Sequence, residues 1–225
     1  GWSPKRTSLE AYNLLTDKVD KDKIKKVIGT GYGRVSMDFV DKKVTEITCH
    51  TKGIFFLNKD VRTILDIGGQ DSKVINIDDN GNVINFIMND KCAAGTGRFL
   101  EMMAKTMEMS LDDMGKAGLS YKEDITISSM CTVFAESEVV SLIAQNKATD
   151  DIVHGLNKAV ASKTAALAKR VGGEERYMMT GGVSKNQGLV KTLEEKLGTT
   201  LVISDKAQLC GALGAALFAK DMVIE

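Results

Sequence analysis

The sequence predicts an α/β protein on the strength of three features. Short apolar runs at 63–67, 72–77 and 83–88 are separated by glycine turns, one of them an Asn-Gly pair, which is typical of an antiparallel meander. A later apolar run, 177–179, ends in paired glycines. Longer stretches with helical spacing lie before, between and after these strands and complete the α/β pattern.

The composition is that of an ordinary globular protein and limits its partners. The 225 residues are 43% apolar and 27% charged, and this length suits one large domain or two small lobes. Lysine plus arginine balances aspartate plus glutamate at 30 each, so charge offers no case for binding nucleic acid or an anionic membrane. No apolar run reaches the roughly 18–20 residues of a membrane span, and no signal core follows the first basic residues. We therefore expect a cytoplasmic protein with no nucleic-acid or membrane partner.

Helical and strand patterns precede the meander. Apolar residues recur on one helical face in 8–19, and 45–57 is predicted as a second helix. Between them, 25–29 is predicted as a short buried strand that runs into a glycine-rich turn at 30–34.

The rest of the chain is predicted to be mostly helical. The longest helix, 151–171, ends at Gly172-Gly173, a typical C-cap signal. The other predicted elements are helices at 98–109, 132–145 and 208–220 and a strand at 201–203.

The loop after the first strand of the meander is a candidate phosphate loop. The strand delivers Asp66 to the turn Gly68-Gly69-Gln70-Asp71, whose backbone N–H groups can approach phosphate oxygens without interference from a Cβ. The carboxylates could hold Mg²⁺, or water bound to it, beside those phosphates. A hairpin turn that merely needs glycine explains the same residues about as well.

A second glycine loop follows the strand at 177–179. Thr180, Gly181 and Gly182 lead into a polar helix start at Asn186, and the glycines would let an adenine or ribose approach the backbone. A plain β–α turn explains them nearly as well. Gly211 opens a run of small residues in the last helix. It is a further candidate for the nucleotide site, although close helix packing is the simpler explanation of that run alone.

The order of these features resembles the actin, sugar-kinase and Hsp70-type ATPase fold, in which two ribonuclease-H-like lobes close on a nucleotide. The resemblance implies that ATP or ADP binds with Mg²⁺, and that Asp66, Gln70 and Asp71 are the catalytic candidates. It further implies that 59–206 forms one lobe, while 1–58 and 207–225 form the remnant of an incomplete N-terminal lobe.

Two of the four cysteines, Cys92 and Cys131, precede predicted helices. A helix N-terminus favours a thiolate and an anionic cluster. A cubane cluster needs four cysteines, so two chains related by a two-fold axis could complete the set. From the residues alone, two buried and inert cysteines are the commoner explanation.

The strings around these cysteines, NDKCAAGTGRFLE and CTVFAESEV, lie between DIGGQD and TGGV. Together they resemble the activator ATPases of 2-hydroxyacyl-CoA dehydratases and the ATPase subunits of benzoyl-CoA reductase. The resemblance implies a homodimer with one [4Fe-4S] cluster held by Cys92 and Cys131 of both chains. It implies that ferredoxin or flavodoxin supplies an electron, and that ATP drives its transfer to a CoA-ester dehydratase or reductase. Cys49, Cys210 and a packed His50 are predicted to be structural, and His154 to lie on the surface.

The sequence departs from these families in one respect. Their members begin with a strand–Asp–Gly–Ser/Thr–Lys hairpin, the first phosphate loop, and nothing in these residues matches it. We therefore expect the chain as it stands to bind nucleotide weakly. Two alternatives stay open: a small-molecule kinase of the same superfamily, whose catalytic aspartate and sugar cleft the sequence does not identify, and a non-catalytic interaction remnant.

Overall fold

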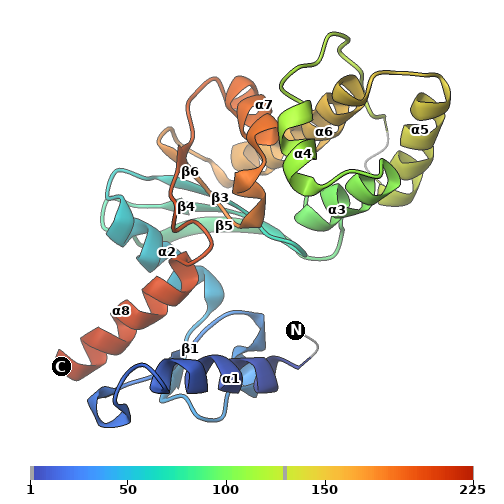
Figure 1. Cartoon of the computed structure of the whole chain (residues 1–225). Coiled ribbons are helices and arrows are strands. Elements are labelled where there is room, and N and C mark those ends of the chain that lie inside the picture. The colour runs from blue at the N-terminus through green and yellow to red at the C-terminus, as the bar shows by residue number, and fades with distance from the viewer. Residues whose placement is uncertain (1–2, 129–130, 225) are drawn as a thin grey trace. The chain divides into compact units, whose positions relative to one another are not determined.

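The computed structural model describes residues 3–128 and 131–224. Ser129 and Met130, which directly precede the second cysteine string, lie outside the described residues. The chain divides into two compact units, which Figure 1 shows in sequence colours. Unit 1 comprises 1–60, 79–83 and 209–225, and unit 2 comprises 61–78 and 84–208. Among the described helices, none has both the length and the apolar character of a membrane span.

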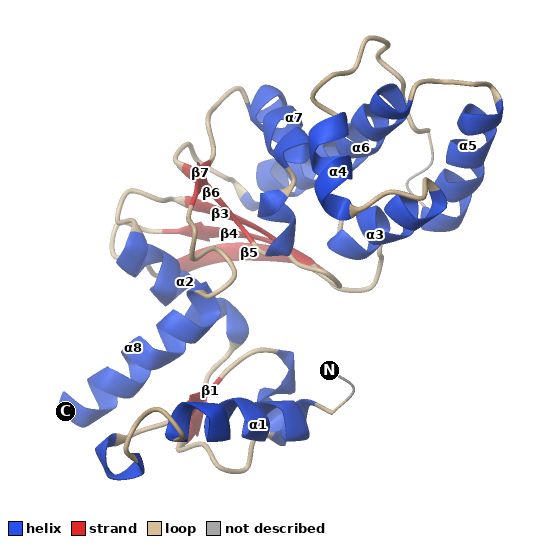
Figure 2. Cartoon of the chain, viewed as in Figure 1, coloured by secondary structure: helices blue, strands red, loops and turns tan. Residues whose placement is uncertain are grey.

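Unit 1 is mainly helical, with a minimal parallel sheet (Figure 2). Its sheet consists of β1 (Ile28–Gly29) and β2 (Lys42–Lys43). Its helices are α1 (Pro4–Thr16), α2 (Glu46–Leu57) and α8 (Cys210–Ile224), with short 3₁₀ turns η1 (Lys21–Lys23) and η2 (Tyr32–Ser36).

The helix α1 begins earlier and ends earlier than the spacing predicted. Ser3 caps it by accepting a hydrogen bond from the Arg6 N–H, and Pro4 occupies the first helical turn, where its missing N–H costs nothing. After Thr16 the chain is rich in lysine and aspartate and forms only η1. The predicted strand 25–29 is correspondingly reduced to β1.

The helices α2 and α8 touch backbone to backbone. A Cβ on Gly214 would lie 1.7 Å from the Cys49 carbonyl oxygen, and one on Gly53 would lie 2.0 Å from the Cys210 carbonyl oxygen. Only glycine permits this crossing, so close packing explains the small-residue run in α8. Cys49 and Cys210 are both fully buried there, as expected for structural cysteines.

Unit 2 is built on a five-stranded mixed sheet in the order β5-β4-β3-β6-β7. The strands β3 (Thr63–Ile67) and β4 (Ser72–Ile77) form the predicted antiparallel hairpin, and β5 (Val83–Asn89) is the next strand outward. On the other side, β6 (Tyr177–Thr180) pairs in parallel with β3, and β7 (Val202–Ile203) with β6. Both β3 and β6 are buried along their whole length, so the candidate loops after them rest on a rigid base.

In the described part of this unit, the helices that accompany the sheet are α3 (Gly97–Thr106), α4 (Leu111–Ala117), α5 (Thr132–Ala144), α6 (Thr149–Val171) and α7 (Gln187–Leu197). The long α6 packs on β3, β4 and α7 and ends, as predicted, at a left-handed Gly172. The prediction of a helix through 109 was wrong. The backbone at Glu108 has φ of 53°, and Ser110 caps a separate helix, α4.

The prediction of a surface position for His154 was wrong, because the loop 118–128 covers this part of α6. His154 is only 4% exposed, and its ring stacks on Tyr121 with the ring centroids 3.4 Å apart. The loop is held on α6 by Asp151, whose Oδ1 accepts the N–H groups of Lys122 and Glu123 at 2.6 and 3.0 Å. Helical spacing cannot show that a loop lies across a helix.

Burial gives His154 a measurable effect on stability. The pKa of His154 is lowered, chiefly by desolvation and also by Lys158, although Asp124, Glu195 and a backbone hydrogen bond at Gly118 act to raise it. The unfolded chain therefore binds more protons than the folded chain below about pH 6.5, so the free energy of unfolding should fall as the pH is lowered from 7 towards 5. One such group contributes at most about 1.4 kcal/mol per pH unit. His154→Phe should keep the stack on Tyr121 and flatten this slope in urea unfolding. An unchanged slope would show that other groups cause it.

Candidate functional site

The candidate phosphate loop is the tight turn between β3 and β4. The Gly68 N–H donates to the Asp71 carbonyl at 2.9 Å and closes the turn. Gly69 and Gln70 are exposed at its tip, where a ligand can reach their backbone N–H groups. The loop is thus a true hairpin turn whose tip also suits phosphate binding.

A buried lysine, which the sequence interpretation missed, links the two aspartates of this loop. The Lys73 Nζ lies 3.2 Å from Asp66 Oδ2 and 2.9 Å from Asp71 Oδ2. Asp66 Oδ1 accepts the Thr180 hydroxyl at 3.0 Å. The contact could have been predicted from the sequence. A hairpin with a four-residue turn at 68–71 pairs Asp66 with Lys73 on the neighbouring strand, and the observed register has this pair.

The second glycine loop lies beside the first. Because β3 and β6 are parallel, their carboxyl ends meet at one edge of the sheet, with Asp66 opposite Thr180. Gly181 has φ of 82° and ψ of 172°, and a Cβ on it would lie 2.2 Å from the Ile67 carbonyl oxygen. The two loops therefore touch, and glycine is required where they do.

The residues after Gly181 start a helix. Gly182–Lys185 forms a 3₁₀ turn, η3, and Asn186 caps α7 by accepting the Leu189 N–H on its Oδ1 at 2.8 Å. Asn186 thus stabilises the start of α7, and it also lines a cavity beside the two loops.

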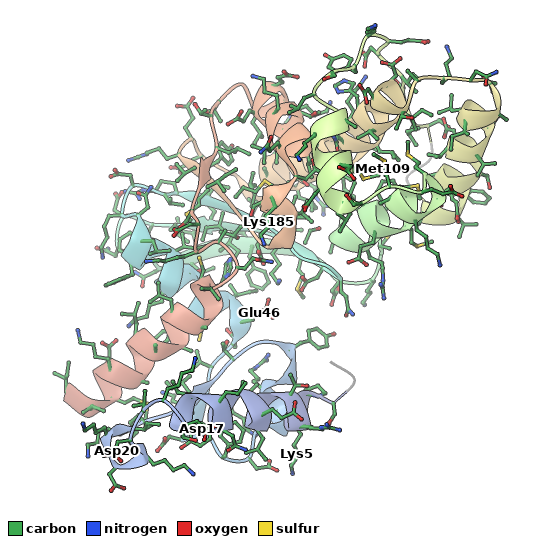
Figure 3. The ribbon with its side chains drawn as sticks, viewed as in Figure 1. Lys5, Asp17, Asp20, Glu46, Met109 and Lys185 are labelled. Atoms are coloured by element: carbon green, nitrogen blue, oxygen red, sulfur yellow. The ribbon has the colours of Figure 1, made fainter. Side chains whose placement is uncertain are left out.

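A cavity of about 260 Å³ opens beside these loops within unit 2. Among the predicted residues, Gly69, Gly182 and Asn186 line it. Lining residues that the sequence interpretation did not select come from η3, α3, α4 and the chain before α8: Gly97, Leu100, Glu101, Leu111, Asp112, Val183, Lys185 and Gln208. Lys185 is labelled in Figure 3. The volume is near the lower end of the roughly 300–1,000 Å³ of small-molecule sites.

The remaining candidates lie elsewhere. Asp66 and Thr180 are buried in the sheet and contact each other, and Gln70 and Asp71 belong to the loop but are not in the cavity lining. Gly211 belongs to unit 1, where its Cβ position is 4.0 Å from His50 Nδ1. Unit 1 has a larger cavity of about 540 Å³ among α2, α8 and 80–83, and none of the predicted site residues lines it.

Cys92 is exposed in the loop between β5 and α3. The loop is anchored from within, since the Asn89 side chain donates to the Cys92 and Ala94 carbonyls at 2.9 and 3.1 Å, and Lys163 donates to the Ala94 carbonyl at 2.6 Å. The N-cap of α3 is Thr96. Cys92 therefore lies in the loop before the helix and not at the helix end.

Cys131, by contrast, lies at a helix end, because it is the N-cap of α5. It is exposed, as are the apolar side chains of Val133 and Phe134 that follow it. The interpretation of both cysteines as buried is thus wrong. Within the described residues, no group of three or more His, Cys, Asp or Glu side chains is placed to hold a metal ion.

Hydrogen bonds connect the phosphate loop to the helix that follows Cys92. The Gly97 N–H donates to the Gly68 carbonyl and the Arg98 N–H to the Gly69 carbonyl, both at 2.8 Å. The helix α3 in turn packs on α5, and Thr106 donates to Glu136 between them at 2.9 Å. The loop and the two helices after the exposed cysteines therefore form one connected structure.

Comparison with known proteins gives consistent matches. The BadF/BadG/BcrA/BcrD ATPase family matches residues 10–219. The 2-hydroxyisocaproyl-CoA dehydratase activator of Clostridioides difficile is 47% identical over 201 residues, 89% of this chain and 76% of the relative. The activator of lactoyl-CoA dehydratase of Anaerotignum propionicum is 46% identical over 218 residues, 97% of this chain and 83% of the relative.

A solved structure supports the same assignment. The activator of the 2-hydroxyisocaproyl-CoA dehydratase from Clostridium difficile, with bound ADPNP, superposes with a TM-score of 0.90 at 44% identity. The match covers 98% of this chain and 82% of that one. The predicted ATPase fold class is thereby confirmed.

Proposed function

The chain belongs to the BadF/BadG/BcrA/BcrD ATPase family, and on that premise we propose that it uses ATP to pass single electrons to a CoA-ester dehydratase. The names of its relatives support the partner class, since two at 46–47% identity are activators of 2-hydroxyisocaproyl-CoA and lactoyl-CoA dehydratases. A ferredoxin or flavodoxin would supply the electron, and the cytoplasm is the compartment we propose.

The nucleotide would bind at the edge of the sheet where the two glycine loops meet. The backbone N–H groups of Gly68, Gly69 and Gln70 would face the phosphates, and the turn at Gly181 and Gly182 would border the adenosine. Gln70, exposed at the loop tip, is the best placed of the predicted catalytic residues to orient a water molecule. Asp66 is buried under the loop and acts through it.

Magnesium fits this site only partly. Mg²⁺ prefers carboxylate, water and phosphate oxygens in octahedral geometry. Asp66 and Asp71 are the carboxylates at the two ends of the loop, yet each already faces the Lys73 ammonium group. They do not fit as a pair of direct ligands, and we assign no step to a metal held by them.

The exposed cysteines fit an iron–sulfur centre shared by two chains. A [4Fe-4S] cluster, when bound, supplies a one-electron carrier and takes four thiolates. One chain contributes Cys92 and Cys131, so a two-fold homodimer would complete the set. Cys131 would offer its sulfur from the N-cap of α5, and Cys92 would offer its sulfur from the anchored loop before α3.

The observation that best supports this function is the pair of hydrogen bonds from Gly97 and Arg98 to the phosphate loop. A nucleotide that shifts Gly68 and Gly69 must also shift the first turn of α3 and the Cys92 loop before it. ATP can bias such a movement only by binding its two states with unequal affinity.

The test is ATP-dependent activation of a dehydratase under anaerobic conditions. The reduced protein should activate a 2-hydroxyacyl-CoA dehydratase with ATP and not with ADPNP, because hydrolysis completes the cycle. It should be a brown dimer. A colourless monomer whose ATP hydrolysis depends on a sugar would indicate the kinase alternative, and a colourless protein without ATPase activity the interaction remnant.

A further inference from the structure

We propose that Lys73 is the resident cation of the phosphate loop: its ammonium group fills the place between Asp66 and Asp71 that a divalent metal would otherwise take, and so holds the loop in shape. The proposal depends on the proposed function only where nucleotide affinity is measured.

The geometry is that of one cation between two acids. The Lys73 Nζ is within hydrogen-bonding distance of both carboxylates, 3.2 Å from Asp66 and 2.9 Å from Asp71. The Lys73 side chain is 4% exposed, and those of Asp66 and Asp71 are 9% and 19% exposed. An ammonium group has three N–H donors, enough to serve both acids at once.

The position of Lys73 explains why these carboxylates are unsuited to magnesium. A metal bound between them would approach their oxygens to about 2.0–2.1 Å and would lie directly beside the ammonium group. Two like charges at that distance repel strongly in a site this buried. Asp66 is further committed, since its other oxygen accepts the Thr180 hydroxyl.

The same contacts make Lys73 a positioning residue. Asp66 is the penultimate residue of β3, the strand that enters the loop, and Asp71 is the last residue of the loop. Lys73 therefore connects the beginning of the loop with its end. The Gly68 N–H and the Asp71 carbonyl close the turn between them. A loop held in this way keeps its tip N–H groups converged on one place, which a phosphate can then occupy.

Removing the ammonium group should convert the pair of aspartates into a binding site for a divalent cation. In Lys73→Met, the buried carboxylate of Asp66 and the partly exposed carboxylate of Asp71 lose the cation that they share, which favours capture of a divalent cation. Manganese is a suitable probe because its resonance signal reports free Mn²⁺. Without nucleotide, we expect Lys73→Met to bind one Mn²⁺ per chain at least about tenfold more tightly than the unmodified protein. The double variant Lys73→Met/Asp66→Asn should lose that gain.

Two outcomes overturn the proposal. One is a folded Lys73→Met protein that binds Mn²⁺ no better than the unmodified protein. The other is an unmodified protein that already binds a Mn²⁺ ion which Asp71→Asn removes. If Lys73→Met does not fold, the comparison of the unmodified protein with Asp71→Asn decides alone. Equal Mn²⁺ binding by these two proteins supports the proposal.

ATP binding is measured in a separate experiment, in which Lys73→Met should weaken the affinity for ATP at least about tenfold. The Mn²⁺ titration contains no nucleotide, so its result tests the role of Lys73 independently of the proposed ATPase function.

Discussion

Replacing either Cys92 or Cys131 by serine is expected to remove the bound iron altogether. A serine hydroxyl stays protonated near neutral pH and does not replace a thiolate, and a shared cluster loses two of its four ligands when each chain loses one. The measurement is iron and sulfide content with the visible spectrum after anaerobic reconstitution. We expect about four iron atoms per dimer in the unmodified protein and none in either variant.

The other two cysteines provide matched controls. Cys49 and Cys210 are fully buried at the crossing of α2 and α8, and burial raises the pKa of the Cys49 thiol. Cys49→Ser and Cys210→Ser should therefore keep the full iron content, at some cost in stability. A monomer that carries a complete cluster, or loss of iron in the control variants, would contradict the shared-ligand arrangement.

Replacing Gly181 by alanine is expected to destabilise unit 2 by about 2–5 kcal/mol. Its backbone conformation is one that residues with a side chain essentially never adopt. The added Cβ would also lie 2.2 Å from the Ile67 carbonyl oxygen, so β3 and β6 would have to separate where the two loops meet. Urea unfolding measures the change.

Gly198→Ala is the matched control for this prediction. Gly198 also has a positive φ, 68°, but beyond its chain neighbours no atom of the described residues lies within 4 Å of its Cβ position. It should lose only the conformational cost of about 1–2 kcal/mol. Equal losses at the two positions would show that the close approach of the loops contributes nothing beyond the backbone angle. A folded Gly181→Ala protein should also bind ATP more weakly than Gly198→Ala.

The sequence by itself determined the features that depend on neighbouring residues. The strands 63–67 and 72–77 were predicted to the residue, because apolar runs bounded by glycine turns specify a hairpin locally. Gly172 marked the end of α6 for a similar reason. The boundaries of α1 and α3 were less accurate and α4 was not predicted, since these ends depend on the capping contacts of Ser3 and Ser110.

Only the tertiary structure decided which distant surfaces meet. The parallel pairing of β3 with β6 places Thr180 on Asp66 across more than a hundred residues of sequence, and no local pattern encodes that pairing. The burial of His154 depends on a loop that lies across α6, and the cavity collects side chains from several separate segments. Periodicity and turn signals report which face of an element is apolar. Which other element packs against that apolar face depends on packing and charge pairing over the whole unit, as between Lys73 and its two aspartates.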